Sequence, residues 1–253
     1  MSKKLLTLIL VVLLATCIYV FSTKTNNTLK PYFPLNENDQ YVYQHEEGPE
    51  SSIVTITVKN VKHISDGTEF DFLFQGQHND RIQTSRLTAK GLLFCRNKHL
   101  VGQVPMKVIR EFSPPILLLP YKLEKSIAFE SSENVYDYDG KLIDKEKIEA
   151  IVSFVGFEEV NVEAGRFKCR HFFVKLNYED QLGNSTRMHA YNFWVVPGLG
   201  YVKVVHSYTP FASFAYFNYI KPEDKTIMNR YNSPFTELLE LKKAVIAGKG
   251  IGR

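Results

Sequence analysis

The sequence predicts a mainly β protein made of two related antiparallel curved sheets or of one long curved sheet, with an amphipathic helix at the carboxyl end. The chain contains 18 Phe and 14 Tyr among its 253 residues, and aromatic residues are enriched in strands. Apolar and polar residues alternate in several runs, so that Val54, Ile56 and Val58 share one face of a strand. Short turns separate the runs, and Asp139-Gly140 is the strongest hairpin signal among them. Alternating runs joined by short turns indicate a series of hairpins.

The strands fall into two stretches, residues 31–112 and residues 113–222, joined at a Ser-Pro-Pro sequence. Pro34 precedes Tyr41 by seven residues, and Pro120 precedes Ile127 by the same interval. A spacing that recurs in this way is typical of an internal repeat, and it predicts two related β halves. The alternative is that unrelated β segments reuse the same turn residues.

The carboxyl end, residues 233–248, is predicted to be the one helix. Ser233 can cap a helix and Pro234 suits its first turn. Gly248 would end it. The residues expected on the apolar stripe are Phe235, Leu238, Leu239, Leu241, Val245 and Ile246.

The amino-terminal segment, residues 1–22, is typical of an export signal or membrane anchor. Lys3 and Lys4 precede an apolar run that extends from Leu5 to Phe21, which is the charged-then-apolar order of export signals. The run is close to the minimum of about 17 residues that span a bilayer as a helix. Because positive flanks stay in the cytoplasm, we expect the rest of the chain to be exported and to face the periplasm or the cell exterior. Residues 23–30 are polar and predict a short tether.

Three fates of this segment are open. The sequence Leu14-Ala15-Thr16-Cys17 resembles a bacterial lipobox, in which Cys17 would be lipidated after cleavage. Small residues near Ser22 would also suit an ordinary signal peptidase. An uncleaved segment would be a single-helix anchor, so that the membrane is the predicted partner of this part of the chain.

Cys95 and Cys169 are the cysteines that follow the export segment. In an oxidising compartment two thiols can pair, so a Cys95–Cys169 disulfide is a candidate. The alternative is that both are buried thiols that pack as small apolar side chains.

The sequence carries no recognised catalytic motif. We find neither a nucleophile elbow of the Gly-x-Ser-x-Gly type nor a phosphate-binding loop. The net charge of +4 is spread among interleaved acids and bases, whereas nucleic-acid binding requires a clustered basic surface. His171, His189 and His206 could be neighbours on adjacent strands, but their spacing matches no metal motif. We therefore expect no enzyme activity, no cofactor, no metal and no nucleic-acid partner.

The aromatic strands favour a ligand-binding function. Phe172, Val174 and Leu176 share one face of a predicted strand, and a concave apolar face can hold a lipid or an acyl chain. Together with Trp194 and Phe214 they are the candidate ligand-binding residues. The alternative is that the other half, or the carboxyl-terminal helix, covers this face as ordinary core.

Three segments resemble a group of exported bacterial proteins of unknown function that is known as TapB-like. They are residues 32–43, residues 162–169 and residues 196–203. Members of this group similarly open on Pro-Leu with a Gly and a Trp-x-Tyr, carry an Ala-Gly-x-Phe turn and end on Pro-Gly-Val-Gly-x-Val-Lys. Here Asn38 stands near the usual Gly, and Tyr41 stands in place of a Trp. The resemblance implies a β-rich fold, distantly like lipoprotein carriers, and implies no catalytic residues.

Taken together, these patterns predict a non-enzymatic, envelope-tethered β protein that binds an apolar ligand or an envelope partner. A structural or assembly module that binds other proteins through its sheet edges is the alternative. A hydrolase whose site lies outside the known motifs is the third reading, and a cleft with clustered histidines and acids would favour it.

Overall fold

The computed structural model describes residues 31–76, 80–101, 104–123, 125–137, 139–210 and 234–252. The predicted export segment and tether, with Cys17, lie outside the described residues, and so does Phe214. By its contacts, the chain from Pro31 to Arg253 forms one compact unit.

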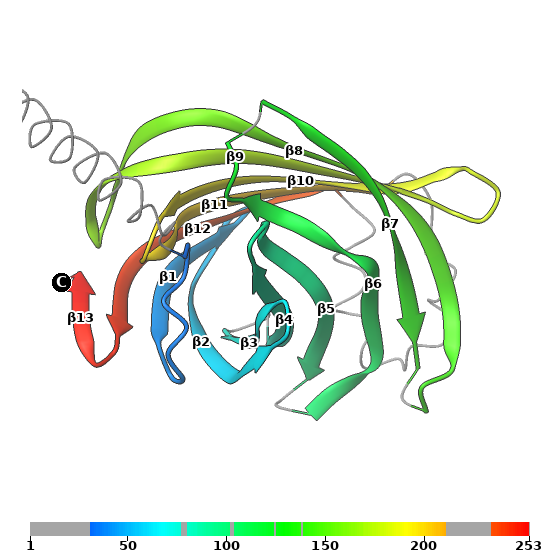
Figure 1. Ribbon diagram of the computed structural model, residues 1–253, viewed down its shortest axis with the longest axis horizontal. Coiled ribbons are helices and arrows are strands. Elements are labelled where there is room, and N and C mark those ends of the chain that lie inside the picture. Colours follow the sequence, from blue (N-terminus) through cyan, green and yellow to red (C-terminus); the bar gives the residue numbers. More distant parts are fainter. Residues whose placement is uncertain are drawn as a thin grey trace, which may run out of the picture. The chain divides into compact units, whose positions relative to one another are not determined.

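The described chain is a series of antiparallel strands joined by short turns (Figure 1). Each strand pairs with the next, and β1 also pairs with β12, so that twelve strands close into a barrel while β13 adds to β12 alone. The strands are β1 (Gln40–Glu47), β2 (Glu50–Ile64), β3 (Gly67–Gln75), β4 (Arg81–Thr88), β5 (Gly91–Val101), β6 (Val104–Pro120), β7 (Ile127–Tyr136), β8 (Leu142–Val162), β9 (Gly165–Glu179), β10 (Ser185–Val196), β11 (Gly200–Pro210), β12 (Phe235–Ile246) and β13 (Lys249–Gly252).

The structure corrects the predicted fold class, because one sheet closes on itself where curved sheets in two halves were expected. Closure removes the exposed edges that an open sheet would leave. The predicted join at residue 113 lies inside β6, and the sheet continues through it without a break.

The predicted carboxyl-terminal helix, residues 233–248, is also wrong. Phe235–Ile246 is β12, which hydrogen-bonds to β11 on one side and to β1 on the other. The apolar stripe was ambiguous, since Leu239 and Leu241 fit a period of two as well as a helical period. Because β1 and β11 each need a partner strand, this segment forms a strand and not a helix. No helix among the described residues has the length and the hydropathy that a membrane span requires.

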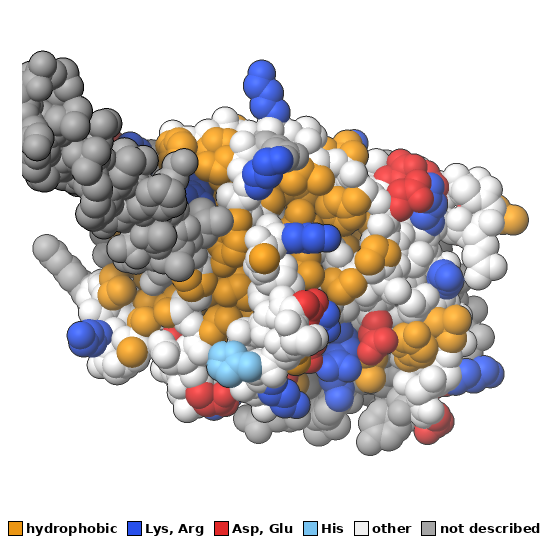
Figure 2. All heavy atoms as spheres, viewed as in Figure 1, with side chains coloured by type: hydrophobic (Ala, Val, Ile, Leu, Met, Phe, Trp, Pro, Cys, Tyr) orange, Lys and Arg blue, Asp and Glu red, His pale blue; other side chains and the backbone are white. Residues whose placement is uncertain are grey.

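Alternation along the strands explains the interior of the barrel, because successive side chains point to opposite faces. The three alternating apolar residues of β2, Val54, Ile56 and Val58, are all buried. Phe70, Phe72 and Phe74 of β3 and Phe172, Val174 and Leu176 of β9 are buried in the same way. On the outer face, hydrophobic side chains lie among lysine, arginine and acidic side chains (Figure 2).

Aromatic side chains from the segment before β1 fill one end of the barrel, which we call the closed end. Tyr32 and Phe33 are completely buried. The Phe33 ring packs at 4.8 Å from the Tyr201 ring, measured between centroids. Gly200, with a φ of +98°, leaves the room for this contact, since a Cβ there would lie 2.3 Å from the Phe33 ring. The opposite end, where β1 ends and β12 begins, is called the far end.

The hairpin of β8 and β9 is longer than its neighbours, and its tip folds back to β12. The Ala164 amide donates a hydrogen bond to the Leu241 carbonyl at 3.1 Å. Lys242 pairs with Glu163 at 3.0 Å. Cys169, near this tip, is completely buried although it lies outside the phase of the inward-facing residues of β9.

Candidate functional site

The barrel lumen contains a cavity of about 150 Å³. Every strand of the closed barrel except β8 contributes a side chain to its wall. The wall changes character along the barrel, as β10 illustrates: Arg187 and His189 lie toward the far end, whereas Phe193 lies toward the closed end. The cavity is therefore amphipathic, with an apolar part and a charged part.

The apolar part of the wall lies in the middle of the barrel. It includes Ile56, Leu118, Leu176, Phe193, Val204 and Leu239. Tyr43 lies beside these residues, and its hydroxyl donates a hydrogen bond to the Tyr201 carbonyl at 2.9 Å. Burial raises the pKa of Tyr43 well above its ordinary value, so this phenol stays protonated.

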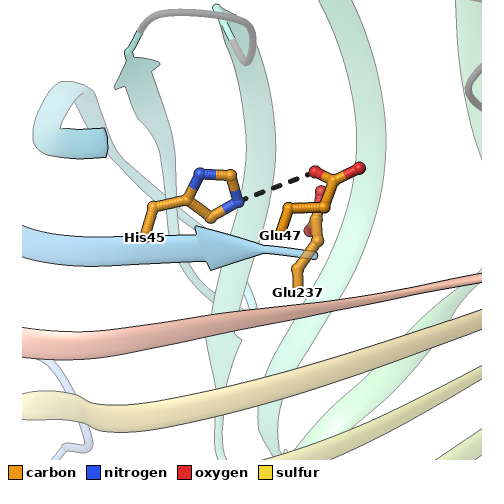
Figure 3. Close-up of side chains that lie close together, drawn as sticks. All are labelled: His45, Glu47 and Glu237. Carbon is orange, nitrogen blue, oxygen red and sulfur yellow. Dashed lines mark ion pairs between the residues drawn. The ribbon is translucent and has the colours of Figure 1, made fainter. Parts of the chain in front are cut away.

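His45, Glu47 and Glu237 meet where β1 and β12 close the barrel at the far end (Figure 3). His45 and Glu47 are two residues apart on β1, so they point to the same face. Glu237 of β12 stands directly opposite Glu47 in the strand register. His45 Nε2 lies 3.9 Å from Glu47 Oε2. One imidazole and two carboxylates are thus held together by paired strands.

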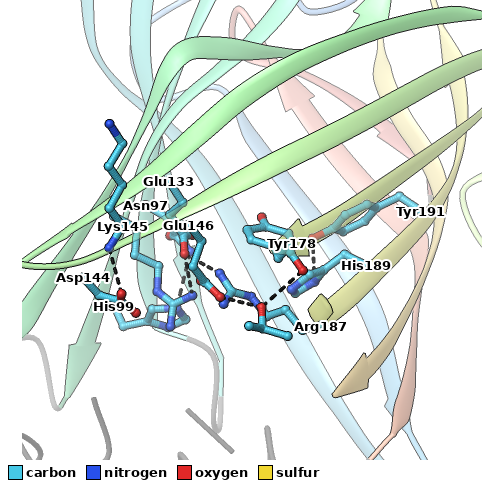
Figure 4. Close-up of polar contacts among 12 residues, drawn as sticks. Asn97, His99, Glu133, Asp144, Lys145, Glu146, Tyr178, Arg187, His189 and Tyr191 are labelled. Carbon is cyan, nitrogen blue, oxygen red and sulfur yellow. Dashed lines mark hydrogen bonds and ion pairs between the residues drawn. The ribbon is translucent and has the colours of Figure 1, made fainter. Parts of the chain in front are cut away.

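Arg187 is the centre of a buried charged cluster in the far half of the barrel (Figure 4). Its guanidinium pairs with the carboxylates of Glu133 and Glu146, and it lies 3.8 Å from the centroid of the Tyr178 ring. Arg110 reaches Glu133 at 3.5 Å. The positive charges of the two arginines equal the negative charges of the two glutamates. This matters because an unpaired buried charge is strongly destabilising.

Two histidines from neighbouring strands face each other in the cavity wall. His189 Nδ1 lies 2.9 Å from His206 Nε2, and His206 Nδ1 lies 3.3 Å from Glu237 Oε2. Burial lowers the pKa of His189 well below its ordinary value, and the charges of His206 and Arg187 lower it further. His189 is therefore neutral at physiological pH.

Arg81 contributes a positive charge to the wall at the far end. Its guanidinium stacks on the Phe74 ring, with 4.1 Å between the guanidinium carbon and the ring centroid. Within the described part of the chain it forms no ion pair, in contrast to Arg110 and Arg187. Of the three arginines that line the cavity, Arg110 and Arg187 contact carboxylates, whereas Arg81 does not.

The structure places the predicted ligand-binding residues in three different settings. Leu176 lines the cavity, whereas Phe172 and Val174 are buried in the packed interior beyond it. Trp194 lies on the opposite face of its strand, where it stacks on His171 at 4.3 Å between ring centroids. Its indole Nε1 donates a hydrogen bond to Glu158 at 2.7 Å. Trp194 is therefore not among the residues that line the cavity, and its part in ligand binding stays a prediction.

Of the three histidines expected to be neighbours, the structure joins two. His189 and His206 meet in the cavity, whereas His171 lies with Trp194 and donates a hydrogen bond from Nδ1 to the Glu158 carboxylate at 2.7 Å. The charged residues of the wall were not found from the sequence. Their signal was the alternation Arg187-x-His189-x-Tyr191-x-Phe193, in which polar residues occupy the same inward phase as Phe193.

The predicted disulfide is not present. Cys95 on β5 and Cys169 on β9 are free thiols, and these strands are not neighbours in the sheet. Burial raises the pKa of each thiol to about 11. Both therefore stay protonated and unreactive at neutral pH.

Comparison with known proteins gives three similar solved structures. No family model and no curated protein matches the chain. A candidate lipoprotein from Parabacteroides distasonis is 14% identical, with a TM-score of 0.49 over 85% of this chain and 98% of that one. A candidate exported protein with a YmcC-like fold from Bacteroides fragilis is 15% identical, with a TM-score of 0.47 over 84% and 97%. The hypothetical lipoprotein YmcC from Escherichia coli is 8% identical, with a TM-score of 0.40 over 87% and 91%.

These three proteins are named as lipoproteins or as an exported protein. At such identities and TM-scores they assign neither a family nor an activity to the chain. The TapB-like resemblance stays a prediction.

Proposed function

We propose that the chain is a non-enzymatic, envelope-tethered protein that holds a small amphipathic anion in the lumen of its barrel. The observation that carries the proposal is the cavity, whose wall is apolar in the middle of the barrel and charged toward the far end. An amphipathic molecule would bury its apolar part and keep its polar group beside the charged side chains. The export-type segment at residues 1–22 supports a location outside the cytoplasm.

The volume of the cavity limits the ligand. A cavity of about 150 Å³ in an engineered protein core accepts benzene, whereas drug-sized ligands occupy pockets of about 300 to 1,000 Å³. The lumen cavity has the smaller volume. This size favours the end of an acyl chain or a small aromatic acid, and it disfavours the whole lipid that the sequence had suggested.

The charge of the wall selects an anionic head group. Arg187 and Arg110 are already held by Glu133 and Glu146. Arg81 has no carboxylate at ion-pair distance among the described residues, and its guanidinium lies on the ring of Phe74, next to the apolar part of the wall. A carboxylate at Arg81 would gain a charge-assisted hydrogen bond, which contributes about 1.5 to 3 kcal/mol.

Isothermal titration calorimetry with hexanoate and 1-hexanol tests this proposal. Both probes are short and water-soluble, so they suit the full chain in detergent. We expect hexanoate to bind more tightly than 1-hexanol, and Arg81→Gln to weaken hexanoate about 10-fold or more while leaving 1-hexanol unchanged. Arg96→Gln is the matched control, because Arg96 is exposed and pairs with Glu111 on the outside.

Equal hexanoate affinity in the wild type and in Arg81→Gln would contradict the role of Arg81. Failure of both probes to bind would contradict the proposal as a whole.

A hydrolase is the second candidate, because His189, His206 and Glu237 form a polar cluster in the cavity wall. Such a cluster could move a proton. In the part of the chain that the structure describes, however, neither histidine hydrogen-bonds to a serine, threonine or cysteine that could act as its nucleophile. Turnover of small esters by the wild type, lost in His206→Gln, would favour this candidate over simple binding.

The assembly-module alternative has weaker support. The exposed large hydrophobic side chains of β8 are Leu142, Ile151, Val155 and Phe157. Charged side chains lie among the hydrophobic ones on the outer face (Figure 2), whereas a docking surface is a contiguous apolar patch of several hundred Å². The lumen therefore remains the better-supported site.

A further inference from the structure

A second site lies at the seam where β1 and β12 close the barrel. The candidate ligand atoms of His45, Glu47 and Glu237 all lie within 4.8 Å of one another (Figure 3). His45 and Glu237 are buried, and the Glu47 side chain is 12% exposed. The three side chains come from paired strands, so the backbone hydrogen bonds of the seam fix their spacing.

The strand register brings like charges together. Glu47 and Glu237 are directly opposite in the β1–β12 pairing, and opposed like charges destabilise a sheet. Burial strengthens this repulsion, because a low dielectric screens charges less than water does. A cation between the two carboxylates would replace the repulsion with attraction.

The imidazole of His45 is oriented for such a cation. Its Nδ1 lies 3.1 Å from the hydroxyl of Ser52 on β2. With Nδ1–H donated to Ser52, the lone pair of Nε2 is directed toward Glu47, which is 3.9 Å away. Metal-binding histidines use their second ring nitrogen in this way, because the outer hydrogen bond fixes the tautomer and the ring.

We propose that His45, Glu47 and Glu237 bind a divalent first-row transition metal ion, for which Zn²⁺ is the appropriate probe. An imidazole ligand favours Zn²⁺ and its neighbours over Ca²⁺ and Mg²⁺, which prefer oxygen ligands alone. Two carboxylates balance the charge of the ion. Three protein ligands would leave one position of a tetrahedral site open. Glu237 also lines the cavity.

Two basic side chains near Glu237 have to be compatible with the ion. They are His206, whose Nδ1 lies 3.3 Å from Oε2, and Arg81, which lines the same cavity wall. With Oε2 held by His206, Oε1 remains to bind the ion, and His206 then supports the ligand from outside.

The site goes beyond the lumen ligand and does not depend on it. A metal ion bound here would link β1 to β12, the two strands whose pairing closes the barrel. Metal binding is thus expected to stabilise the folded barrel as well as to fill a coordination site.

Titration of the chelator-treated full chain with ZnCl₂ tests the site by calorimetry and by thermal unfolding. We expect one ion per chain, and a Tm increase of about 5 to 10 °C at a hundredfold excess of free Zn²⁺ over its Kd. MgCl₂ and CaCl₂ should leave the Tm unchanged. In Glu47→Gln/Glu237→Gln the Zn²⁺-dependent shift should disappear, while the metal-free Tm is equal to or above that of the wild type because the repulsion is gone.

Further variants separate this site from other zinc ligands. Glu47→Gln alone changes the most accessible ligand and serves if the double variant does not fold; its Zn²⁺ affinity should fall about 10-fold or more. His63→Ala, on the exposed part of β2, should keep the full response. A Zn²⁺ response that persists in both glutamine variants, or that is lost instead in His189→Gln, would overturn the proposal. So would the absence of any shift at about 1 mM ZnCl₂.

Discussion

The two ends of the barrel are formed by the same twelve strands but have different interiors. At the closed end, Tyr32 and Phe33 fill the lumen, and rings such as Tyr121 stack on them. In the far half, the inward positions carry Arg187, His189 and other polar residues, and a cavity remains. Rings of different orientation can pack without gaps, whereas charged groups need defined partners at defined angles. Packing therefore stabilises one end of the barrel, and the other end retains space for a ligand.

Removing Arg187 should give the largest effect on stability. Arg187→Leu would leave Glu133 and Glu146 buried without their central partner. We expect the free energy of unfolding to fall by about 3 to 5 kcal/mol, as is usual when one member of a buried ion cluster is removed. Urea denaturation followed by tryptophan fluorescence measures this. Arg166→Gln, in an exposed pair with Glu159, is the control and should change little.

A triple variant sharpens this test of the far end. Arg187→Met, Glu133→Gln and Glu146→Gln together remove both signs of charge, and should recover most of the stability that Arg187→Leu loses. If stability is not recovered, the cluster stabilises the fold by its specific hydrogen bonds. The far end would then contribute to stability as the closed end does, which contradicts the contrast between the two ends.

The closed end should instead respond to volume. Gly200→Ala places a Cβ about where the Phe33 ring lies and keeps a φ of +98°. We expect a loss of about 2 to 3 kcal/mol from overpacking and backbone strain together. In a Phe33→Ala background the ring is absent, so only the strain of about 1 kcal/mol should remain. A double-mutant cycle by urea denaturation measures this coupling, and strictly additive effects would show that Phe33 does not fill the space beside Gly200.

Acid should destabilise the fold through the far end of the barrel rather than through the closed end. The loss of stability for each histidine should be smaller than that for the substitutions above. Burial, with the charges of Arg110 and Arg81, lowers the pKa of His99 to about 3. The unfolded chain therefore binds this proton between pH 6.5 and 3, while the folded chain does not. Stability that is present above about pH 6.5 is lost as the pH falls, by about 1 kcal/mol between pH 7 and 5.5.

His189, whose pKa is lowered in the same direction, should behave likewise. His99→Gln and His189→Gln should each reduce the slope of stability against pH over this window, whereas the exposed His63→Ala should not. Slopes that do not differ from the wild type would show that these two histidines are protonated in the folded barrel.

The strands could be predicted from the sequence, whereas the closure of the barrel could not. The alternation at Val54, Ile56 and Val58 and the turn at Asp139-Gly140 are local signals, and both lie where the structure has β2 and the turn before β8. The pairing of β1 with β12 joins Gln40 to Val245, and no local pattern reports a contact at that separation. For the same reason, the residues of β12 fitted a helix until their partner strands were known.

The candidate site was predicted least well, for a physical reason. Apolar residues in an inward phase identify a core, and Leu176 was found in this way. Arg187 and Glu237 occupy the same phase with the opposite chemistry, and in the sequence they are indistinguishable from surface charges. Their partners come from strands far away along the chain, such as Glu133 on β7 and Glu47 on β1.

The most direct test of the account is to locate a bound anion by methyl NMR. The full chain, with labelled Ile, Leu and Val methyl groups, would be titrated with hexanoate, and nuclear Overhauser effects from the hexanoate chain would be recorded. The lumen proposal predicts contacts to Ile56, Val204 and Leu239, which line the cavity. Contacts only to Ile53 and Ile151, which are exposed on the outer face, would contradict it.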